Sequence, residues 1–204
     1  MTTIAVPAAS LASGKGHRDE NFPVASFLLK PAHRAPVMAF YHFARAADDV
    51  ADNEAATASQ KLALLGAMRA TLSGKGDTNV EAGALRAVLD QHGLSPQHAL
   101  DLLTAFERDC TVNRYATWED LMDYCRYSAA PVGRYVLDVH GEDQATWPAS
   151  DALCAALQVI NHVQDCAKDY RAIDRVYIPT EMLGAAGASV TDLGAERASA
   201  PLRS

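Results

Sequence analysis

Apolar residues recur at intervals of three and four along most of this chain, the spacing that gives an α-helix one buried face. No segment of useful length alternates apolar and polar residues as a half-buried strand would, and no repeat of 20–50 residues is found. The pattern predicts helices at about 36–53, 59–72, 80–91, 96–111, 117–140, 148–170 and 190–202, with an extended segment at 175–179. We therefore expect an all-α domain.

Prolines and capping residues indicate where these helices begin and break. Pro36 suits the first turn of a helix, where the missing N–H of proline costs nothing. Thr117 with Asp120 resembles a capping box, in which each residue bonds the backbone of the other. Pro131 and Gly133 fall inside the helix that begins there, so we expect a kink or break near them.

The size and composition of the chain are those of an ordinary soluble domain. It has 204 residues, of which 49% are hydrophobic and 21% charged. We expect a flexible tail at 1–18 and one helical domain at 19–204, incomplete at its C-terminal end because the 190–202 helix simply stops. The net charge of −7 argues against a nucleic-acid partner, which would need a basic surface.

The cysteines and the longest apolar runs indicate the compartment. The four cysteines lack metal-binding spacing, which favours free, buried thiols in a reducing, cytoplasmic environment. No run approaches the roughly 18 apolar residues of a membrane span. The sequence gives no indication of oligomeric state.

Two aspartate pairs share the spacing Asp-x-x-x-Asp, namely Asp48 with Asp52 and Asp165 with Asp169. Residues four apart lie on the same face of a helix, so each pair offers two carboxylates to one point in space. Two such pairs facing each other could hold hard divalent cations. Mg²⁺ held by a few carboxylates usually completes its coordination shell with substrate phosphates.

Each pair lies on a longer polar stripe. Tyr41 and Arg45 precede the first pair at helical spacing, and Gln158 and Asn161 precede the second. An apolar flank accompanies the second stripe, formed by Leu153, Leu157, Ile160 and Val163. A single pair would ordinarily be a solvated helix face, but two pairs with an amide or arginine on each stripe favour a ligand site. A di-iron bundle is disfavoured because it needs Glu-x-x-His, which the chain lacks. His42 and His162, beside the stripes, are expected to be packed or capping residues.

The segments around both pairs resemble the aspartate-rich motifs of the squalene and phytoene synthases. They read Tyr41-His-Phe-Ala-Arg-Ala-Ala-Asp-Asp-Val-Ala-Asp52 and Leu157-Gln-Val-Ile-Asn-His-Val-Gln-Asp-Cys-Ala-Lys-Asp-Tyr-Arg171. Three further segments are similar to the bacterial hopanoid-pathway branch, the hydroxysqualene synthases: Glu20-Asn-Phe-Pro-Val-Ala-Ser26, Tyr124-Cys-Arg-Tyr-Ser-Ala-Ala-Pro-Val-Gly-Arg134 and Asp174-Arg-Val-Tyr-Ile-Pro179. The Ser-Ala-Ala-Pro stretch differs from the Val-Ala-Gly pattern of phytoene and eukaryotic squalene synthases. The resemblance runs from about residue 19 to the end.

The resemblance implies an isoprenoid-synthase-type helical bundle around a central cavity, with the last helices of the bundle missing from this chain. It implies that Mg²⁺, bridging to the substrate diphosphate, is held by Asp48, Asp52, Asn161, Asp165 and Asp169. The four aspartates, with Tyr41 near the same site, would be the catalytic residues.

The resemblance also assigns residues to the two ends of the substrate. Arg45 and Arg175 would contact the diphosphate, whose oxygens suit the planar guanidinium group, and Ser26 falls near the same site. The cavity for the prenyl tails would be lined by Phe22, Phe40, Tyr127, Val132, Gly133 and Leu157. Apolar residues at helical spacing are equally well explained as core.

The activity implied is conversion of presqualene diphosphate to hydroxysqualene, with Mg²⁺ as cofactor and no nicotinamide. One alternative is a head-to-head prenyltransferase that joins two farnesyl or geranylgeranyl diphosphates to presqualene diphosphate, squalene or phytoene. The other is a non-catalytic helical family member, although all four aspartates are present. An apolar product is compatible with transient contact at the inner face of the membrane.

Overall fold

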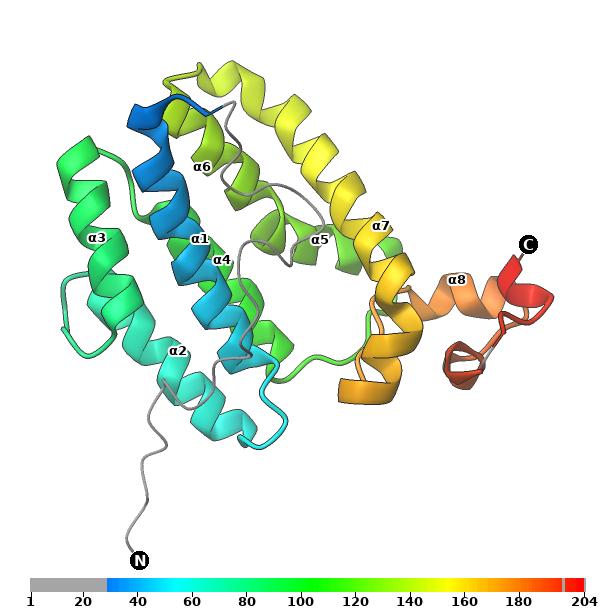
Figure 1. Cartoon of the computed structure of the whole chain (residues 1–204). Coiled ribbons are helices and arrows are strands. Elements are labelled where there is room, and N and C mark those ends of the chain that lie inside the picture. Colours follow the sequence, from blue (N-terminus) through cyan, green and yellow to red (C-terminus); the bar gives the residue numbers. More distant parts are fainter. Residues whose placement is uncertain (1–28, 196, 204) are drawn as a thin grey trace, which may run out of the picture.

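The computed structural model describes residues 29–195 and 197–203, and the described chain is helical, with no β-sheet (Figure 1). The α-helices are α1 (Pro31–Ala51), α2 (Ala58–Leu72), α3 (Val80–His92), α4 (Gln97–Asp109), α5 (Trp118–Ser128), α6 (Ala130–His140), α7 (Trp147–Ile173) and α8 (Thr180–Ala185). Short 3₁₀ turns are η2 (Gln144–Thr146), η3 (Val190–Gly194) and η4 (Pro201–Arg203). The all-α expectation is confirmed, whereas the predicted tail at 1–18 lies outside the described residues.

The main core is formed by the apolar faces of α1 to α4. Phe43, Leu65, Leu85 and Leu103, one from each helix, have no exposed surface. Tyr135 of α6 joins this core, so α6 is fixed against α1 as well as against α7. This arrangement makes α1 a rigid support for the polar side chains that it carries at its C-terminal end.

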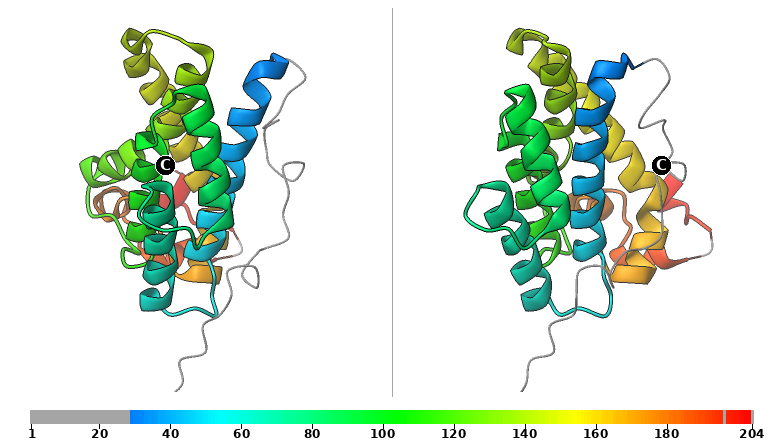
Figure 2. Two further views of the ribbon diagram at one scale, coloured as in Figure 1. Left: turned by 90° about the vertical axis from the view of Figure 1, so that its left-hand side faces the viewer. Right: turned by 60° about the vertical axis from the view of Figure 1, so that its left-hand side comes forward.

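Helices α1 and α7 run in the same direction, with α7 crossing from α6 toward α8 (Figures 1 and 2). Their C-terminal halves, which carry the two aspartate pairs, therefore lie at the same end of the molecule. The two helices have mostly different neighbours, since α1 packs mainly on α3, α4 and α2, whereas α7 packs mainly on α6, η3 and α5. The fold thus brings the two motifs together through the elements on which each helix packs.

The prediction for Pro36 is wrong in position. The first turn of α1 is taken by Pro31, and Pro36 lies inside the helix. An interior proline loses a backbone hydrogen bond and commonly costs about 3 kcal/mol in an exposed helix. Here its ring is buried and its carbonyl accepts a hydrogen bond of 3.0 Å from the Tyr135 hydroxyl, so tertiary packing compensates for the local defect.

The break expected near Pro131 is confirmed. Ala129 separates α5 from α6, and α5 begins with the predicted capping box between Thr117 and Asp120. Gly133 has a different role from a helix breaker, because it lies inside α6 where α7 approaches. A Cβ atom there would lie 2.4 Å from Oγ of Ser150 and 2.6 Å from Sγ of Cys154, so only glycine permits this contact unchanged.

The helix predicted at 190–202 is wrong, since η3 and η4 are single 3₁₀ turns. Ser189 and Asp192 form a capping box, but Gly194 and Pro201 are unfavourable inside an α-helix, and the described residues form short 3₁₀ segments instead. Helix α8, which the sequence pattern did not predict, follows Pro179.

The four cysteines are free, as predicted, but burial is complete only at Cys125. Cys110, Cys154 and Cys166 are half-buried. Among the described helices, none combines the length and the apolar character that crossing a membrane would require.

Candidate active site at the ends of α1 and α7

The first aspartate pair lies at the C-terminal end of α1, where Asp48 is in the last turn and Asp52 is the capping residue. The second pair, Asp165 and Asp169, lies in the last three turns of α7. All four side chains are at least partly exposed to solvent, so each is accessible to a ligand.

Arg175 connects the two helix ends. Helix α7 stops at Asp174, which has the left-handed angles φ 51° and ψ 36° and turns the chain back on itself. The backbone N–H groups of Asp174 and Arg175 then both donate to the carbonyl of Asp169. The Arg175 side chain crosses to α1, where Nη1 donates to Oδ1 of Asp52 at 2.8 Å. Only 7% of this side chain is exposed, so its position is strongly constrained.

The segment after α7 is held from the other side by the loop that follows α4. Arg114 donates to the carbonyl and the carboxylate of Asp174, and the N–H of Val176 donates to the carbonyl of Asn113 at 2.9 Å. The extended conformation predicted at 175–179 is consistent with this short parallel bridge between Arg114 and Val176. Arg175 is therefore anchored on both sides along the backbone.

On α1, negative charge is concentrated around one arginine. Arg45 donates to Asp48 at 2.9 Å and to Asp49 at 2.8 Å. The pKa of Asp48 is nevertheless raised to about 7, first because protein atoms crowd the carboxyl and second because Asp52 is nearby. The crowding is uneven, since 36% of the Asp48 side chain is still reached by solvent. A cation bound at this pair would relieve the repulsion.

On α7, burial raises the pKa of Asp169, with a further contribution from Asp165. Lys168 lies 4.0 Å from Asp165 on a largely exposed part of the helix. Asn161 is exposed one turn before Asp165, on the same stripe as predicted. In the second pair, as in the first, burial and a neighbouring carboxylate raise the pKa of one aspartate, and the effect is smaller.

The donor set fits Mg²⁺ only in combination with a phosphate ligand. In the described part of the chain, no group of three or more His, Cys, Asp or Glu side chains comes together as a metal site. Two carboxylates that repel each other are, however, the usual protein contribution to Mg²⁺, which takes its other ligands from water and substrate phosphates. The residues are consistent with that mode of binding, and Mg²⁺ stays a prediction.

Several predicted substrate contacts are found on or near the two helices. Tyr41 is half-buried on α1, with its ring 5.5 Å from that of His42, and Tyr127 of α5 packs beside a second aromatic core. Ser26 and Phe22 lie outside the described residues, so their roles stay predictions. Of the two histidines expected to be packed, His162 is buried, whereas His42 is exposed.

The expected lining of the prenyl cavity is only partly in place. Phe40 belongs to the main core, where it is 4% exposed and stacks on Tyr135 with 4.1 Å between the ring centroids, which favours the core alternative for this residue. Gly133 serves the contact between α6 and α7. Val132 and Leu157 are partly exposed, at 39% and 52%.

Leu157 is one of four half-exposed apolar side chains along α7, which we call the apolar face of α7: Leu153, Leu157, Ile160 and Val163. Each has between 51% and 61% of its surface exposed. A run of large exposed apolar residues is unusual on a soluble protein and commonly marks a binding surface. Leu153 and Leu157 lie on the same i, i+4 row of the helix as Asn161 and Asp165, whereas Ile160 and Val163 lie further round.

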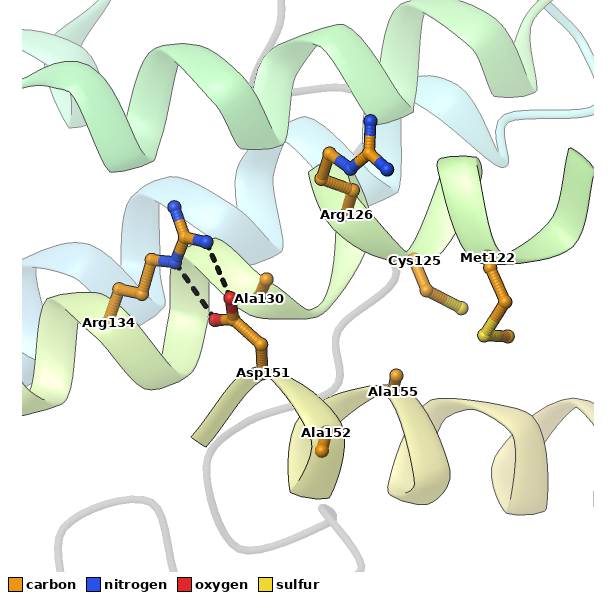
Figure 3. A pocket seen from close by; sticks show the side chains of 8 residues that line it. All are labelled: Met122, Cys125, Arg126, Ala130, Arg134, Asp151, Ala152 and Ala155. Atoms are coloured by element: carbon orange, nitrogen blue, oxygen red, sulfur yellow. Dashed lines mark hydrogen bonds and ion pairs between the residues drawn. The ribbon is translucent and has the colours of Figure 1, made fainter. Parts of the chain in front are cut away.

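A pocket of about 240 Å³ lies between α5, α6 and α7 (Figure 3). Its wall includes Arg134 and Asp151, which are joined by two hydrogen bonds that tie α6 to α7. It contains none of the predicted site residues. The central cavity implied by the resemblance therefore stays a prediction.

Sequence reasoning missed a buried polar cluster beside Arg175. The carboxylate of Asp109, at the end of α4, accepts hydrogen bonds from the hydroxyls of Tyr124 at 2.8 Å and Tyr177 at 3.2 Å. Burial raises the pKa of Asp109 to about 6, against the opposing effect of Arg175. A local signal was available, since Asp109 falls four and seven residues after the buried Ala105 and Leu102, on the apolar face of α4.

Comparisons with known proteins agree with this arrangement. The family model for squalene/phytoene synthase matches residues 16–204. The chain is 59% identical to a hydroxysqualene synthase of Zymomonas mobilis subsp. mobilis over 198 residues, which are 96% of this chain and 67% of that protein. It is 56% identical over 195 residues to a hydroxysqualene synthase of Rhodopseudomonas palustris, with the same coverage. The chain thus spans about two thirds of the length of these relatives.

The fold is also similar to that of solved structures. A squalene synthase from Alicyclobacillus acidocaldarius superimposes with a TM-score of 0.76 at 36% identity, covering 96% of this chain and 73% of that one. This similarity confirms the isoprenoid-synthase-type fold predicted from the motifs. The matched residues include both aspartate pairs and Arg175, so we conclude that the chain belongs to the squalene/phytoene synthase family and is an enzyme of the synthase type.

Proposed function

We propose that this chain converts presqualene diphosphate to hydroxysqualene with release of diphosphate, using Mg²⁺ as cofactor. The observation that carries the proposal is that both aspartate pairs lie at the same end of the molecule, where Arg175 joins the end of α7 to Asp52. The similarity to two hydroxysqualene synthases supports this branch of the family.

The polar end of the site suits a diphosphate leaving group. Asp48, Asp52, Asp165 and Asp169, with Asn161, would hold the metal. When bound, Mg²⁺ would stabilise negative charge that develops on the departing diphosphate. Arg45 and Arg175 would add guanidinium donors, which match phosphate oxygens in geometry and charge.

The apolar face of α7 suits the hydrocarbon part of the substrate. Leu153 and Leu157 continue the helix row of Asn161 and Asp165, so a molecule with its diphosphate head at the aspartates could lay a prenyl tail along these two side chains. Apolar surroundings also limit the access of water to a carbocation, which restricts side reactions.

The reaction balances without an added reductant. The bond between carbon and the diphosphate oxygen breaks, the cyclopropylcarbinyl cation rearranges, and one water molecule bonds to carbon and gives up a proton. Presqualene diphosphate and water thus yield hydroxysqualene and diphosphate. We place this reaction in the cytoplasm, with transient contact between the enzyme and the membrane that receives the apolar product.

The test is to incubate the purified chain with Mg²⁺ and presqualene diphosphate, without NADPH, and to identify the extracted products by mass spectrometry. Hydroxysqualene is the expected product. A parallel incubation with farnesyl diphosphate tests the head-to-head alternative, which predicts presqualene diphosphate from that donor, and squalene only when NADPH is added as the hydride source. Absence of product from both substrates would contradict the proposed activity for this chain.

A further inference from the structure

The side chain of Arg175 has more than one acidic neighbour. Nη1 donates to Asp52 at 2.8 Å, Nη2 donates to the backbone carbonyl of Asp109 at 2.9 Å, and Nε lies 4.0 Å from Oδ1 of Asp109. The guanidinium group therefore has the Asp52 carboxylate on one side and, on the other, the backbone carbonyl of Asp109, with the Asp109 carboxylate close enough for attraction between charges but without a hydrogen bond to Nε. The carbonyl that it bonds is one of those left without a helical partner at the C-terminal end of α4.

The carboxylates of Asp52 and Asp109 differ in how easily each can move away from Arg175. The Asp52 side chain is 45% exposed, so it can turn toward another ligand at little cost. The Asp109 side chain is 4% exposed, and both of its oxygens accept tyrosine hydroxyls. A buried carboxylate with its hydrogen bonds satisfied on both sides stays where it is, because moving it would break those bonds without replacement.

Tyr124 and Tyr177 fix that carboxylate from two further elements. Tyr124 comes from α5, and Tyr177 comes from the extended segment that also carries Arg175. Their hydroxyl oxygens lie 3.4 Å apart, and the Tyr177 hydroxyl also lies 3.4 Å from Nη1 of Arg175. The cluster thus links α4, α5 and the segment after α7 around one guanidinium group.

The cluster also connects to the helix of the second aspartate pair. The ring of His162, on α7, stacks on that of Tyr177 with 3.6 Å between centroids and 14° between planes. A change in the position of the Tyr177 ring would therefore disturb both its contact with Arg175 and its stacking on α7.

From these contacts we propose that Asp109, with the hydroxyls of Tyr124 and Tyr177, is the positioning group that keeps Arg175 aimed at the diphosphate site. The inference rests on the proposed function for the role of Arg175 toward diphosphate. Asp52 is the exchangeable partner of Arg175, because its bond to the guanidinium group is lost when Asp52 binds a cation. Asp109 is the partner that stays in place. Arg175 thus remains oriented in the loaded enzyme, when its bond to Asp52 is lost.

The cluster provides a matched control for the loss of a hydroxyl. Tyr115 stacks on Tyr177 with 5.6 Å between centroids, but its buried hydroxyl has no hydrogen-bond partner among the described residues. Tyr115→Phe and Tyr177→Phe therefore make the same chemical change in the same aromatic cluster, and only the second removes a contact to Asp109 and Arg175.

The first experiment observes Arg175 directly, in the protein without metal or substrate. Protein labelled with ¹⁵N-arginine is studied by NMR, and the guanidinium signals of Arg175 are identified by their absence in Arg175→Lys. We expect hydrogen exchange of these signals to be about tenfold faster in Asp109→Asn and in Tyr177→Phe. We expect Asp52→Asn and Tyr115→Phe to leave an ordered Arg175 signal. The tyrosine variants retain the ring packing, so they decide the matter even if Asp109→Asn folds poorly.

The second experiment measures turnover with Mg²⁺ and presqualene diphosphate. Asp109→Asn should lower kcat about 10–100-fold, the usual effect of removing a group that orients a functional residue, with KM little changed. In an Arg175→Gln background the same substitution should change kcat by less than about twofold, because the residue through which it acts is gone. Asp151→Asn, which breaks the ion pair between α6 and α7 beside the pocket of Figure 3, should leave kcat unchanged.

Two results would overturn the proposal. One is an Arg175 signal that exchanges as slowly in Asp109→Asn and Tyr177→Phe as in the unmodified protein. The other is a loss of kcat on Asp109→Asn that is equally large with and without Arg175, since Asp109 would then act on the structure in general. If the unmodified protein turns over no prenyl diphosphate, the proposed function fails, and the NMR experiment still decides whether Asp109 positions Arg175.

Discussion

The guanidinium of Arg175 lies 2.8 Å from the carboxylate of Asp52, although 123 residues separate them in the chain. Among the described residues, this contact is the only hydrogen bond that the side chain of Asp52 makes. It gives Asp52 a positive partner when no cation is bound, and it leaves Asp48, one turn earlier, with Arg45 as its own partner. Each acid of the first pair therefore has an arginine that it can exchange for a metal ion.

Asp48→Asn and Asp165→Asn should each abolish diphosphate release while the helical content stays unchanged. Each substitution removes one carboxylate and so halves the negative charge that its own pair offers to Mg²⁺. Because the folded state raises the pKa of Asp48, its ionised form is unfavourable there, so Asp48→Asn should melt at the same temperature or higher. Release of diphosphate and circular dichroism are the measurements. Normal turnover by both variants would show that the aspartates are not the metal site.

Binding of Mg²⁺ should depend strongly on diphosphate. Without three carboxylates together in the described residues, the protein alone should bind Mg²⁺ weakly, in the millimolar range or above. Inorganic diphosphate should strengthen binding, because its oxygens complete the coordination shell. Isothermal titration calorimetry with and without diphosphate measures both states. Micromolar binding of Mg²⁺ to the protein alone would contradict the shared site.

His162 should make the protein less stable as the pH falls. Burial, and then the charge of Arg175, lower the pKa of this imidazole from 6.5 to about 3. Between these values the unfolded chain takes up a proton that the folded protein does not, so the free energy of unfolding should fall with decreasing pH from about 6.5 toward 3. The loss is at most about 1.4 kcal/mol per pH unit.

The contribution of His162 is isolated by His162→Phe, which can keep a ring stacked on Tyr177 but cannot be protonated. The difference in unfolding free energy between this variant and the unmodified protein should grow in favour of the variant as the pH is lowered. His42→Phe, at an exposed position, is the control. Urea unfolding at a series of pH values gives the comparison, and parallel curves for His162→Phe and the unmodified protein would show that burial of His162 has no such effect. The raised pKa of Asp109 acts in the opposite direction, but it is common to both proteins and cancels in the difference.

Gly133→Ala should destabilise the protein by about 1–2 kcal/mol. The added methyl group would overlap the side chains of Ser150 and Cys154, and overpacking of about this kind costs roughly 1–3 kcal/mol. The better helix propensity of alanine offsets up to about 1 kcal/mol of that cost. Adding Ser150→Ala and Cys154→Ala should restore most of the loss, because both overlapping atoms are removed.

The matched control is Gly66→Ala in α2, where a Cβ atom would meet nothing within 4 Å. This substitution should stabilise the protein by up to about 1 kcal/mol through helix propensity alone. Chemical denaturation measures all of these variants. Equal effects at the two glycines would mean that the contact between α6 and α7 is not as close as the structure shows.

Predictions from the sequence succeeded where the deciding interactions are local. The capping box of Thr117 and Asp120 and the stripe of Asp165 and Asp169 depend on residues three or four apart, and both are where the pattern placed them. Pro36 was misplaced because its tolerance inside α1 depends on Tyr135, 99 residues away. A local pattern contains no information on such a partner.

The same reasoning explains what was missed at the site. Asp109 and Tyr177 are 68 residues apart. Asp109 belongs to no motif, and Tyr177 lies in the 174–179 segment that carried the resemblance, which gave this tyrosine no role of its own. The position of Asp109 on the buried face of α4 indicated that its charge needed a partner, but could not indicate which residue supplies it. The resemblance identified Arg175, and the structure adds the group that surrounds it.

Asp174 has a consequence for which substitutions this chain can accept. It is the one non-glycine residue with a positive φ among those described, and it directs Arg175 back toward α1. Left-handed backbone is open to glycine and asparagine but unfavourable for β-branched side chains. In a library of variants selected for activity, position 174 should therefore be enriched in Asp, Asn and Gly and depleted of Val, Ile and Thr, even though its side chain is 69% exposed. Position 174 would then tolerate as few residue types as a position in the core, although it lies on the surface. The reason is that its left-handed backbone directs the neighbouring Arg175 toward Asp52.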